Sequence, residues 1–220
     1  MTTLRRILHR VLIVLGTALG ASLLLISGVT MLFGCSFVFY PSPAQGDETA
    51  AARAAGLPVT DVALNAVDGT RLHGWFSAVP GARAALLFLH GNAGTVANRA
   101  HLLRGLRTLP LDVLILDYRG YGLSAGSPTE KGVYADAEAA YGWLRARGYG
   151  PERIVLYGES LGGAVAIETA CRVPVAGLIV QSTFTSIGDM ARRVVPVLPL
   201  LRRETINKKG SIGVSGRCRR

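Results

Sequence analysis

The sequence has few of the residues that build metal centres and disulfide frameworks, and histidine is missing from its second half. Among 220 residues there are three cysteines and four histidines, and no histidine follows His101. Three cysteines, scattered at positions 35, 171 and 218, are too few for a disulfide framework or a zinc site. No pattern of side chains indicates a metal ion or an organic cofactor, so we expect neither.

An excess of positive charge is also absent from most of the chain. The net charge is +10, but residues 36–200 carry 14 basic and 13 acidic side chains, a net of +1 (14 − 13). The remaining positive charge lies at the two ends, before residue 11 and after residue 201. Because no basic stripe runs along the domain, we expect no nucleic-acid binding.

A long uncharged run lies near the start of the chain. Residues 11–33 contain no charged side chain, and as a helix they would span about 35 Å, enough to cross a bilayer. We therefore predict a membrane anchor at 11–33, behind a basic cytoplasmic segment at 1–10. Three arginines precede the run, so the positive-inside rule places the following domain outside the cytoplasm. A cleaved signal peptide ending near residue 20 and a lipid anchor on Cys35 are the alternatives.

The hydrophobic pattern after the uncharged run predicts one α/β domain. Residues 34–58 are rich in proline, alanine and glycine and indicate a linker, and the domain follows at 59–203. Two alternating runs around an Asp-Gly turn predict an antiparallel hairpin, and later continuous apolar runs predict strands buried on both faces. The sequence thus predicts a mostly parallel sheet with an N-terminal antiparallel hairpin. The hairpin is expected at 59–64 and 70–77, buried strands at 84–89 and 113–116, and further strands at 154–156 and 175–180.

Three helices are expected between these strands. The first ends near Leu109. The second begins at Ser127, which can cap it while Pro128 occupies the first helical position and Glu130 closes a capping box. The third follows Ser160 directly.

The segment around Ser160 is the main candidate for a functional site in the sequence. Gly158-Glu159-Ser160-Leu161-Gly162 lies between a predicted strand and a predicted helix, which is the context of a nucleophile elbow. A serine at such a sharp turn needs glycine on either side, because a Cβ at Gly158 or Gly162 would crowd it. The Leu161 amide, at the start of the helix, can then bind a developing oxyanion. A glycine-rich turn that only packs a helix against a sheet is the alternative.

The loop after the 84–89 strand is a candidate for the second half of an oxyanion hole. In this loop, Gly91 and Gly94 allow the backbone to approach a substrate closely, and the amide of Asn92 or of Ala93 would be the donor. His90 begins the loop, and we interpret it as structural and not as a general base. We expect structural contacts also from Asp117, Arg119 and Glu159.

Four motifs occur in order along the domain: His90-Gly91-Asn92-Ala93-Gly94, Asp117 to Ser124, Gly158 to Gly163, and Gln181 to Ser186. Together they resemble those of the α/β-hydrolase superfamily, in particular a membrane-anchored subgroup related to serine aminopeptidases, monoacylglycerol lipases and depalmitoylating thioesterases. The resemblance covers residues 38–203. It implies that Ser160 is the nucleophile and that Asn92 and Leu161 supply oxyanion amides.

The base that would activate Ser160 is missing from the sequence. A serine nucleophile needs an imidazole, and in this superfamily the triad order is Ser, Asp or Glu, then His. No histidine follows Ser160, so the triad Asp and His have no counterpart in the chain. Residues 204–220 form a basic tail without a core pattern, and we expect it to be disordered. The simplest account is a C-terminally truncated domain, and a genuine short variant is the alternative.

These observations favour a serine hydrolase, and we expect this chain to be inactive or weakly active because it lacks the triad Asp and His. Its substrate would be a small acyl compound: an ester, a thioester, a lipid or a peptide. One alternative is a non-catalytic binding or scaffold protein on a truncated hydrolase fold. Another is that only the run at 11–33 is functional and the remainder is unstable. The sequence does not indicate an oligomeric state.

Overall fold

The chain divides into two compact units, Met1–Phe39 and Tyr40–Arg220. The computed structural model describes residues 9–10, 13–23, 25 and 39–183. In the first unit, residues 13–23 are helical. Among the described residues, no helix has both the length and the apolar character needed to span a bilayer. Part of the expected anchor at 11–33 lies outside the described residues, as do the expected tail at 204–220 and the domain after residue 183, so these remain predictions.

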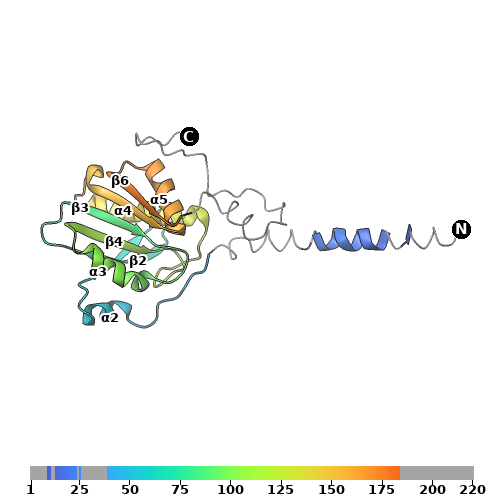
Figure 1. The fold of residues 1–220 in the computed structure, drawn as a ribbon, viewed down its shortest axis with the longest axis horizontal. Helices are drawn as coiled ribbons and strands as arrows, with labels where there is room; N and C mark the ends of the chain where they lie inside the picture. Colours follow the sequence, from blue (N-terminus) through green and yellow to red (C-terminus); the bar gives the residue numbers. More distant parts are fainter. Residues whose placement is uncertain (1–8, 11–12, 24, 26–38, 184–220) are drawn as a thin grey trace. The chain divides into compact units, whose positions relative to one another are not determined.

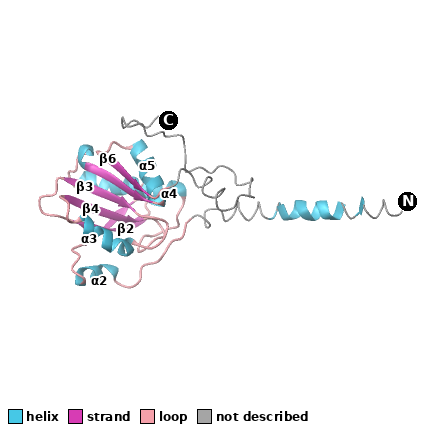
Figure 2. Ribbon diagram, viewed as in Figure 1, coloured by secondary structure: helices cyan, strands magenta, loops and turns pink. Residues whose placement is uncertain are grey.

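A six-stranded mixed sheet forms the centre of the second unit (Figures 1 and 2). The strand order across the sheet is β1-β2-β4-β3-β5-β6. The pairs β1/β2 and β2/β4 are antiparallel, and the pairs β4/β3, β3/β5 and β5/β6 are parallel. The predicted hairpin and mostly parallel sheet are thus confirmed. The strands are β1 (Thr60–Asn65), β2 (Arg71–Ser77), β3 (Ala84–Leu89), β4 (Leu111–Asp117), β5 (Ile154–Glu159) and β6 (Gly177–Gln181).

The two central strands, β3 and β4, contain the continuous apolar runs at 84–89 and 113–116. From the second residue on, every residue of β3 and β4 is buried, because helices cover both faces of the sheet. β1, at the edge, instead alternates between buried and exposed residues. The loop that follows β3 and the turn that follows β5, its parallel neighbour, build the candidate site.

The helices divide between the two faces of the sheet. Leu103 of α3 (Ala100–Leu106) packs in one hydrophobic cluster with Trp75 and Phe88. On the opposite face, Trp143 of α4 (Glu130–Ala146) contacts the ring of Phe76, the neighbour of Trp75 in β2. α5 (Leu161–Arg172) packs beside α4 and on β5. Short 3-10 turns at Val96–Arg99 and Pro151–Arg153 precede α3 and β5.

Two helix boundaries differ from the sequence prediction. α4 begins at Glu130, and its cap is Thr129, whose hydroxyl accepts from Gly132 N at 3.1 Å. Ser127 and Pro128 therefore lie before the helix, and the expected cap at Ser127 is wrong: Thr129 is extended and its hydroxyl reaches the orphan amide first. The helix expected to reach Leu109 ends at Leu106.

Residues 40–58, which the composition indicates as a linker, pack against the domain. They include α2 (Glu48–Ala54), which is capped by Asp47. Leu57 belongs to the main hydrophobic cluster, and the Thr49 hydroxyl accepts from Trp75 Nε1 at 2.8 Å. This segment thus belongs to the folded unit.

Candidate active site

Ser160 occupies a strained turn between β5 and α5. Its backbone angles are φ 52° and ψ −112°, a region that residues with a side chain rarely adopt. The backbone is held there on both sides: Ser160 N donates to Gln181 O at 2.9 Å, and Ser160 O accepts from Gly163 N at 3.0 Å and from Thr183 Oγ1 at 2.8 Å. The structure therefore places Ser160 where strand, turn and helix meet, as a nucleophile elbow requires.

The flanking glycines are required by close backbone contacts. A Cβ on Gly158 would lie 2.3 Å from Gly162 O and 2.5 Å from Gly163 Cα. A Cβ on Gly162 would lie 1.9 Å from Leu89 O, at the end of β3. Neither position has room for a side chain, because the opposing atoms belong to the backbone. The absence of side chains at Gly158 and Gly162 thus allows the first turn of α5 to pack directly against the ends of β5 and β3.

The loop that follows β3 lies beside the nucleophile. A Cβ on Gly91 would be 3.5 Å from Ser160 Cβ and 3.6 Å from Glu159 O. Leu161, whose amide is the other candidate oxyanion donor, is buried at the start of α5. Ser160, Leu161 and the loop containing Asn92 are therefore brought together at the carboxyl ends of two neighbouring parallel strands.

A buried tyrosine holds Asn92. The Tyr121 hydroxyl donates to Asn92, with Asn92 Oδ1 at 2.8 Å and Asn92 O at 3.1 Å. Burial raises the pKa of Tyr121 to about 12, so the hydroxyl keeps its proton and remains a donor at neutral pH. The side chain of Asn92 is thus used to fix the loop, and only its backbone amide is a candidate for catalysis.

Arg99 connects the loop to the elbow. Its Nη1 donates to Ala93 O at 3.0 Å, and its Nε donates to Glu159 Oε2 at 3.3 Å. Glu159 thus makes the structural contact expected from the sequence. Arg99 itself was not indicated by the sequence, because nothing local to residue 99 shows that it reaches a carboxylate 60 residues away.

His90 is a buried structural residue. Its Nδ1 donates to Gly91 O at 2.7 Å, since a carbonyl oxygen can only accept. Its Nε2 lies 3.5 Å from Asp117 Oδ1, where the geometry is too poor for a hydrogen bond. Tyr118 OH donates to His90 O at 3.1 Å. Among the described residues, Ser160 makes no hydrogen bond to a histidine ring.

A chain of charged groups extends from Asp117 to the protein surface. His73 Nε2 donates to Asp61 Oδ1 at 2.8 Å, and His73 Nδ1 lies 3.5 Å from Asp117 Oδ2. Burial acts to lower the pKa of His73, but the hydrogen bonds to Asp117 and Asp61 outweigh it, and the pKa is raised. Burial acts to raise the pKa of Asp117, and the contacts with His73 and His90 lower it below its usual range. Asp117 Oδ1 also accepts from Val96 N at 2.9 Å.

Arg119 forms a second charged group, one that fixes the loop after β4. Its guanidinium donates to Asp136 at 2.8 Å and to Asp68 at 2.7 Å. Asp136 is fully buried in α4, and burial raises its pKa. Asp117 and Arg119 therefore have the structural roles that the sequence indicated. Asp136 was missed because an isolated carboxylate on a predicted helix gives no local sign that it is buried.

No histidine among the described residues is placed to act as a base on Ser160. His73 lies in β2 between two carboxylates, and His101 is exposed on α3. Within the same residues, no group of three or more His, Cys, Asp or Glu side chains is arranged to bind a metal ion. The described site thus consists of a strained serine and the two backbone segments beside it.

Comparisons with known proteins concern the family and the fold. Residues 84–213 match the model of the alpha/beta hydrolase fold family. The chain is 40% identical over 185 residues to the Mycobacterium tuberculosis protein Rv2307c, covering 81% of this chain and 65% of the relative. It is 42% identical over 144 residues to the alpha/beta hydrolase domain-containing protein WAV2 of Arabidopsis thaliana, covering 63% of this chain and 47% of the relative. The chain thus spans less than two thirds of the length of either relative.

Solved structures share the fold. The Pyrococcus furiosus esterase Pf2001 superimposes with a TM-score of 0.61 at 22% identity, covering 76% of this chain and 64% of the esterase. An alpha-beta hydrolase from Vibrio vulnificus superimposes with a TM-score of 0.57 at 27% identity, covering 64% of this chain and 52% of that protein.

Proposed function

Because this chain belongs to the α/β-hydrolase fold family, we propose that its site is that of a serine hydrolase, with Ser160 as the nucleophile. The observation that carries the proposal is the backbone of Ser160. A φ of 52° at a residue with a side chain is strained, and such strain persists where the surrounding structure enforces it. Here it is enforced by the two glycines that admit no Cβ.

The proposed chemistry is acyl transfer to water. Ser160 Oγ attacks the carbonyl carbon of an acyl substrate as a base takes the hydroxyl proton, and the π electrons of the C=O bond become negative charge on the carbonyl oxygen. Collapse of this intermediate expels the alcohol, thiol or amine, and water then releases the acyl group from Ser160. Two amides on separate elements are required to bind that oxygen. The Leu161 amide at the start of α5 is one, and the amide of Asn92 or Ala93 in the neighbouring loop is the other. The nearness of Gly91 to Ser160 supports this pairing.

We propose a small acyl substrate: an ester, a thioester, a lipid or a peptide. The Pyrococcus furiosus protein that shares the fold is named an esterase, which supports an ester as the substrate. The uncharged run at 11–33 supports a membrane location with the N-terminus in the cytoplasm. That location, and the kinship with membrane-anchored aminopeptidases and lipases, are proposals.

The chain as given is proposed to be a weak catalyst. No histidine follows His101 in the sequence, and no described ring nitrogen is bonded to Ser160. Without a base, the hydroxyl proton has no acceptor, and rate enhancement is limited to oxyanion stabilisation and binding. The same observation favours a second candidate function, a non-catalytic binding or scaffold protein on a hydrolase fold.

A fluorophosphonate probe separates these two functions. The full chain is treated with the probe, and the modified serine is located by mass spectrometry. We expect slow labelling confined to Ser160, because its two neighbouring amides stabilise the phosphonyl oxygen as they would an acyl oxyanion. Ser160→Ala is the control and should not be labelled. Labelling spread over several serines, or none at all, would support the scaffold function instead.

A further inference from the structure

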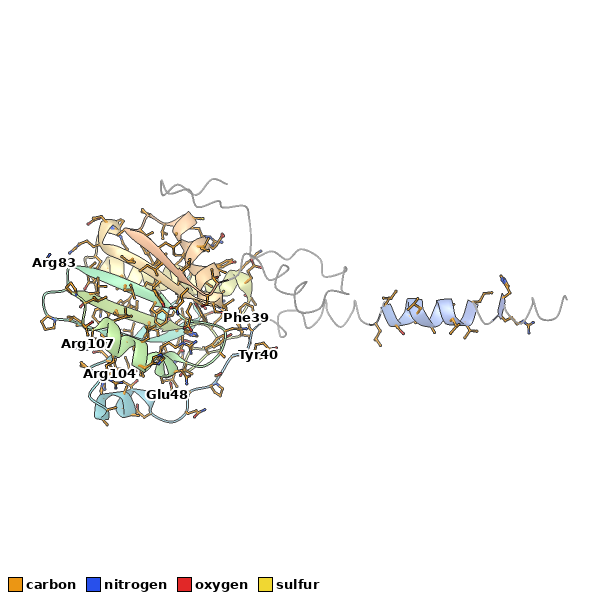
Figure 3. All side chains as sticks on the ribbon, viewed as in Figure 1. Phe39, Tyr40, Glu48, Arg83, Arg104 and Arg107 are labelled. Atoms are coloured by element: carbon orange, nitrogen blue, oxygen red, sulfur yellow. The ribbon has the colours of Figure 1, made fainter. Side chains whose placement is uncertain are left out.

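The segment Tyr40–Glu48, called the strap below, runs along the loop that contains Asn92. Figure 3 labels Tyr40 and Glu48 at its two ends. Tyr40 N donates to Asn92 Oδ1 at 3.1 Å. Further along, Gly94 N donates to Ser42 Oγ at 3.1 Å. The strap therefore supplies partners to two residues of a loop that is more than 45 positions away in the sequence.

Glu48 makes the third tie. Its Oε2 accepts from Thr95 Oγ1 at 2.8 Å, and its Oε1 accepts from Gln45 N at 2.9 Å. One carboxylate thus binds the end of the loop and the strap's own backbone. Because Glu48 is the first residue of α2, and α2 packs into the domain, this tie is anchored to a rigid element.

The strap is also fixed to the loop after β4. Gly122 N donates to Ser42 O at 2.8 Å, and Ala44 N donates to Gly122 O at 3.3 Å. Pro43 and Gly122 form a parallel bridge. The carbonyl of Ser42 therefore binds the loop that follows β4, and its hydroxyl binds the loop that follows β3. Ser42 thus connects the two loops.

We propose that Ser42 and Glu48 are positioning residues for the loop that supplies the second oxyanion amide. The part of this inference that concerns catalysis rests on the proposed function. The loop contains two glycines, and Gly94 has a φ of +79°, so its own backbone resists displacement weakly. An oxyanion donor is effective only when it is held in place before the charge develops. The strap provides that restraint through the side chains of Ser42 and Glu48.

The test compares four variants of the full chain with the wild type. Ser42→Ala removes the acceptor of Gly94 N, Ser42→Thr keeps a hydroxyl, and Glu48→Gln weakens the tie to Thr95. Gln45→Ala is the matched control, because the Gln45 side chain is exposed and the substitution retains the backbone N–H that binds Glu48. Two quantities are measured: amide hydrogen exchange of residues 91–95, and the rate of fluorophosphonate labelling at Ser160.

We expect Ser42→Ala to speed exchange of residues 91–95 about fivefold, which is the factor for a hydrogen bond of ordinary net strength. Glu48→Gln should act in the same direction, exchange in α4 should be unchanged, and Ser42→Thr should restore the wild-type value. Labelling of Ser160 should slow in the same variants and recover in Ser42→Thr.

Two outcomes overturn different claims. If exchange of residues 91–95 in Ser42→Ala and Glu48→Gln equals that in Gln45→Ala, the strap does not hold the loop and the inference is wrong. If exchange changes as expected but no variant, including the wild type, is labelled at Ser160, the proposed function fails while the restraint by the strap stands.

Discussion

Arg99 donates from Nε to Glu159 Oε2 at 3.3 Å and so joins the loop after β3 to the residue that precedes the nucleophile. Its second donor, Nη1, is bound to Ala93 O at 3.0 Å. One guanidinium therefore connects the two halves of the candidate oxyanion hole, and the strap makes separate contacts with the same loop.

Replacing Arg99 should loosen both halves together. Arg99→Gln removes a charge-assisted hydrogen bond and a bond to a carbonyl, and we expect a loss of about 2 kcal/mol in the free energy of unfolding. Arg99→Lys should recover only part of this, because an ammonium cannot span both acceptors as the planar guanidinium does. The measurement is urea unfolding. Arg83→Gln, at an exposed site before β3 (Figure 3), is the control. An equal loss of unfolding free energy at both positions would show that the hydrogen bonds of Arg99 to Glu159 and Ala93 do not stabilise the protein.

Gly158→Ala adds only one methyl group but should greatly lower the free energy of unfolding. The new methyl group would lie 2.3 Å from Gly162 O, and neither backbone can move without disturbing the elbow. We expect a loss of about 3 kcal/mol or more, measured by thermal or urea unfolding. Gly142→Ala is the matched control on the exposed face of α4, where no atom lies within 4 Å of the added carbon. It should stabilise the protein by about 0.5–1 kcal/mol, and similar losses at both sites would argue against the crowded turn.

Breaking the Arg119–Asp136 pair should cost more than removing Asp68 from the same guanidinium. Arg119→Met leaves the fully buried Asp136 without its cation, for which we expect a loss of about 3–5 kcal/mol in urea unfolding. Asp68→Asn removes a partner whose side chain is about half exposed (47%), so its effect should be much smaller. Equal losses would show that burial of Asp136 does not decide the energetics.

His73 should make stability depend on pH near neutrality. The pKa of His73 in the folded protein is raised above its usual value of 6.5, so its contribution to stability is complete below that pH and is lost as the pH rises through the folded pKa. The groups that face it are Asp61 on β1 and Asp117 on β4, with His90 and Arg53 beside those carboxylates. The pKa values of both carboxylates are lowered, so their contribution is lost as the pH falls below about 4.

The measurement for this pH dependence is the melting temperature of the wild type and His73→Gln at pH 5.5 and 8.5. The difference between the two proteins should be larger at pH 5.5. His101→Gln, on the exposed surface of α3, serves as the control and should show no such change. A difference that is the same at both pH values would mean that the proton on His73 is not held by the carboxylates.

The sequence predicted the parts of this protein that depend on local patterns. A few consecutive residues were enough to predict the strands β3 and β4 and the sharp turn at Ser160. Burial requires apolar side chains in those strands, and the turn requires glycines beside Ser160. Thr129 was missed as a cap since Ser127 and Pro128 offered an equally good local start. Arg99, Asp136 and Ser42 act through partners between 17 and 80 positions away, and no local pattern marks them.

Ester hydrolysis with added imidazole tests the central claim most directly, which is that Ser160 is a positioned nucleophile without a base. The full chain and its Ser160→Ala variant are compared on a short-chain nitrophenyl ester across a range of imidazole concentrations. Free imidazole takes the place of the missing general base, so we expect it to raise the wild-type rate at least about tenfold over that of Ser160→Ala, with little difference between them in its absence. Equal rates for the two proteins at every imidazole concentration would contradict the account.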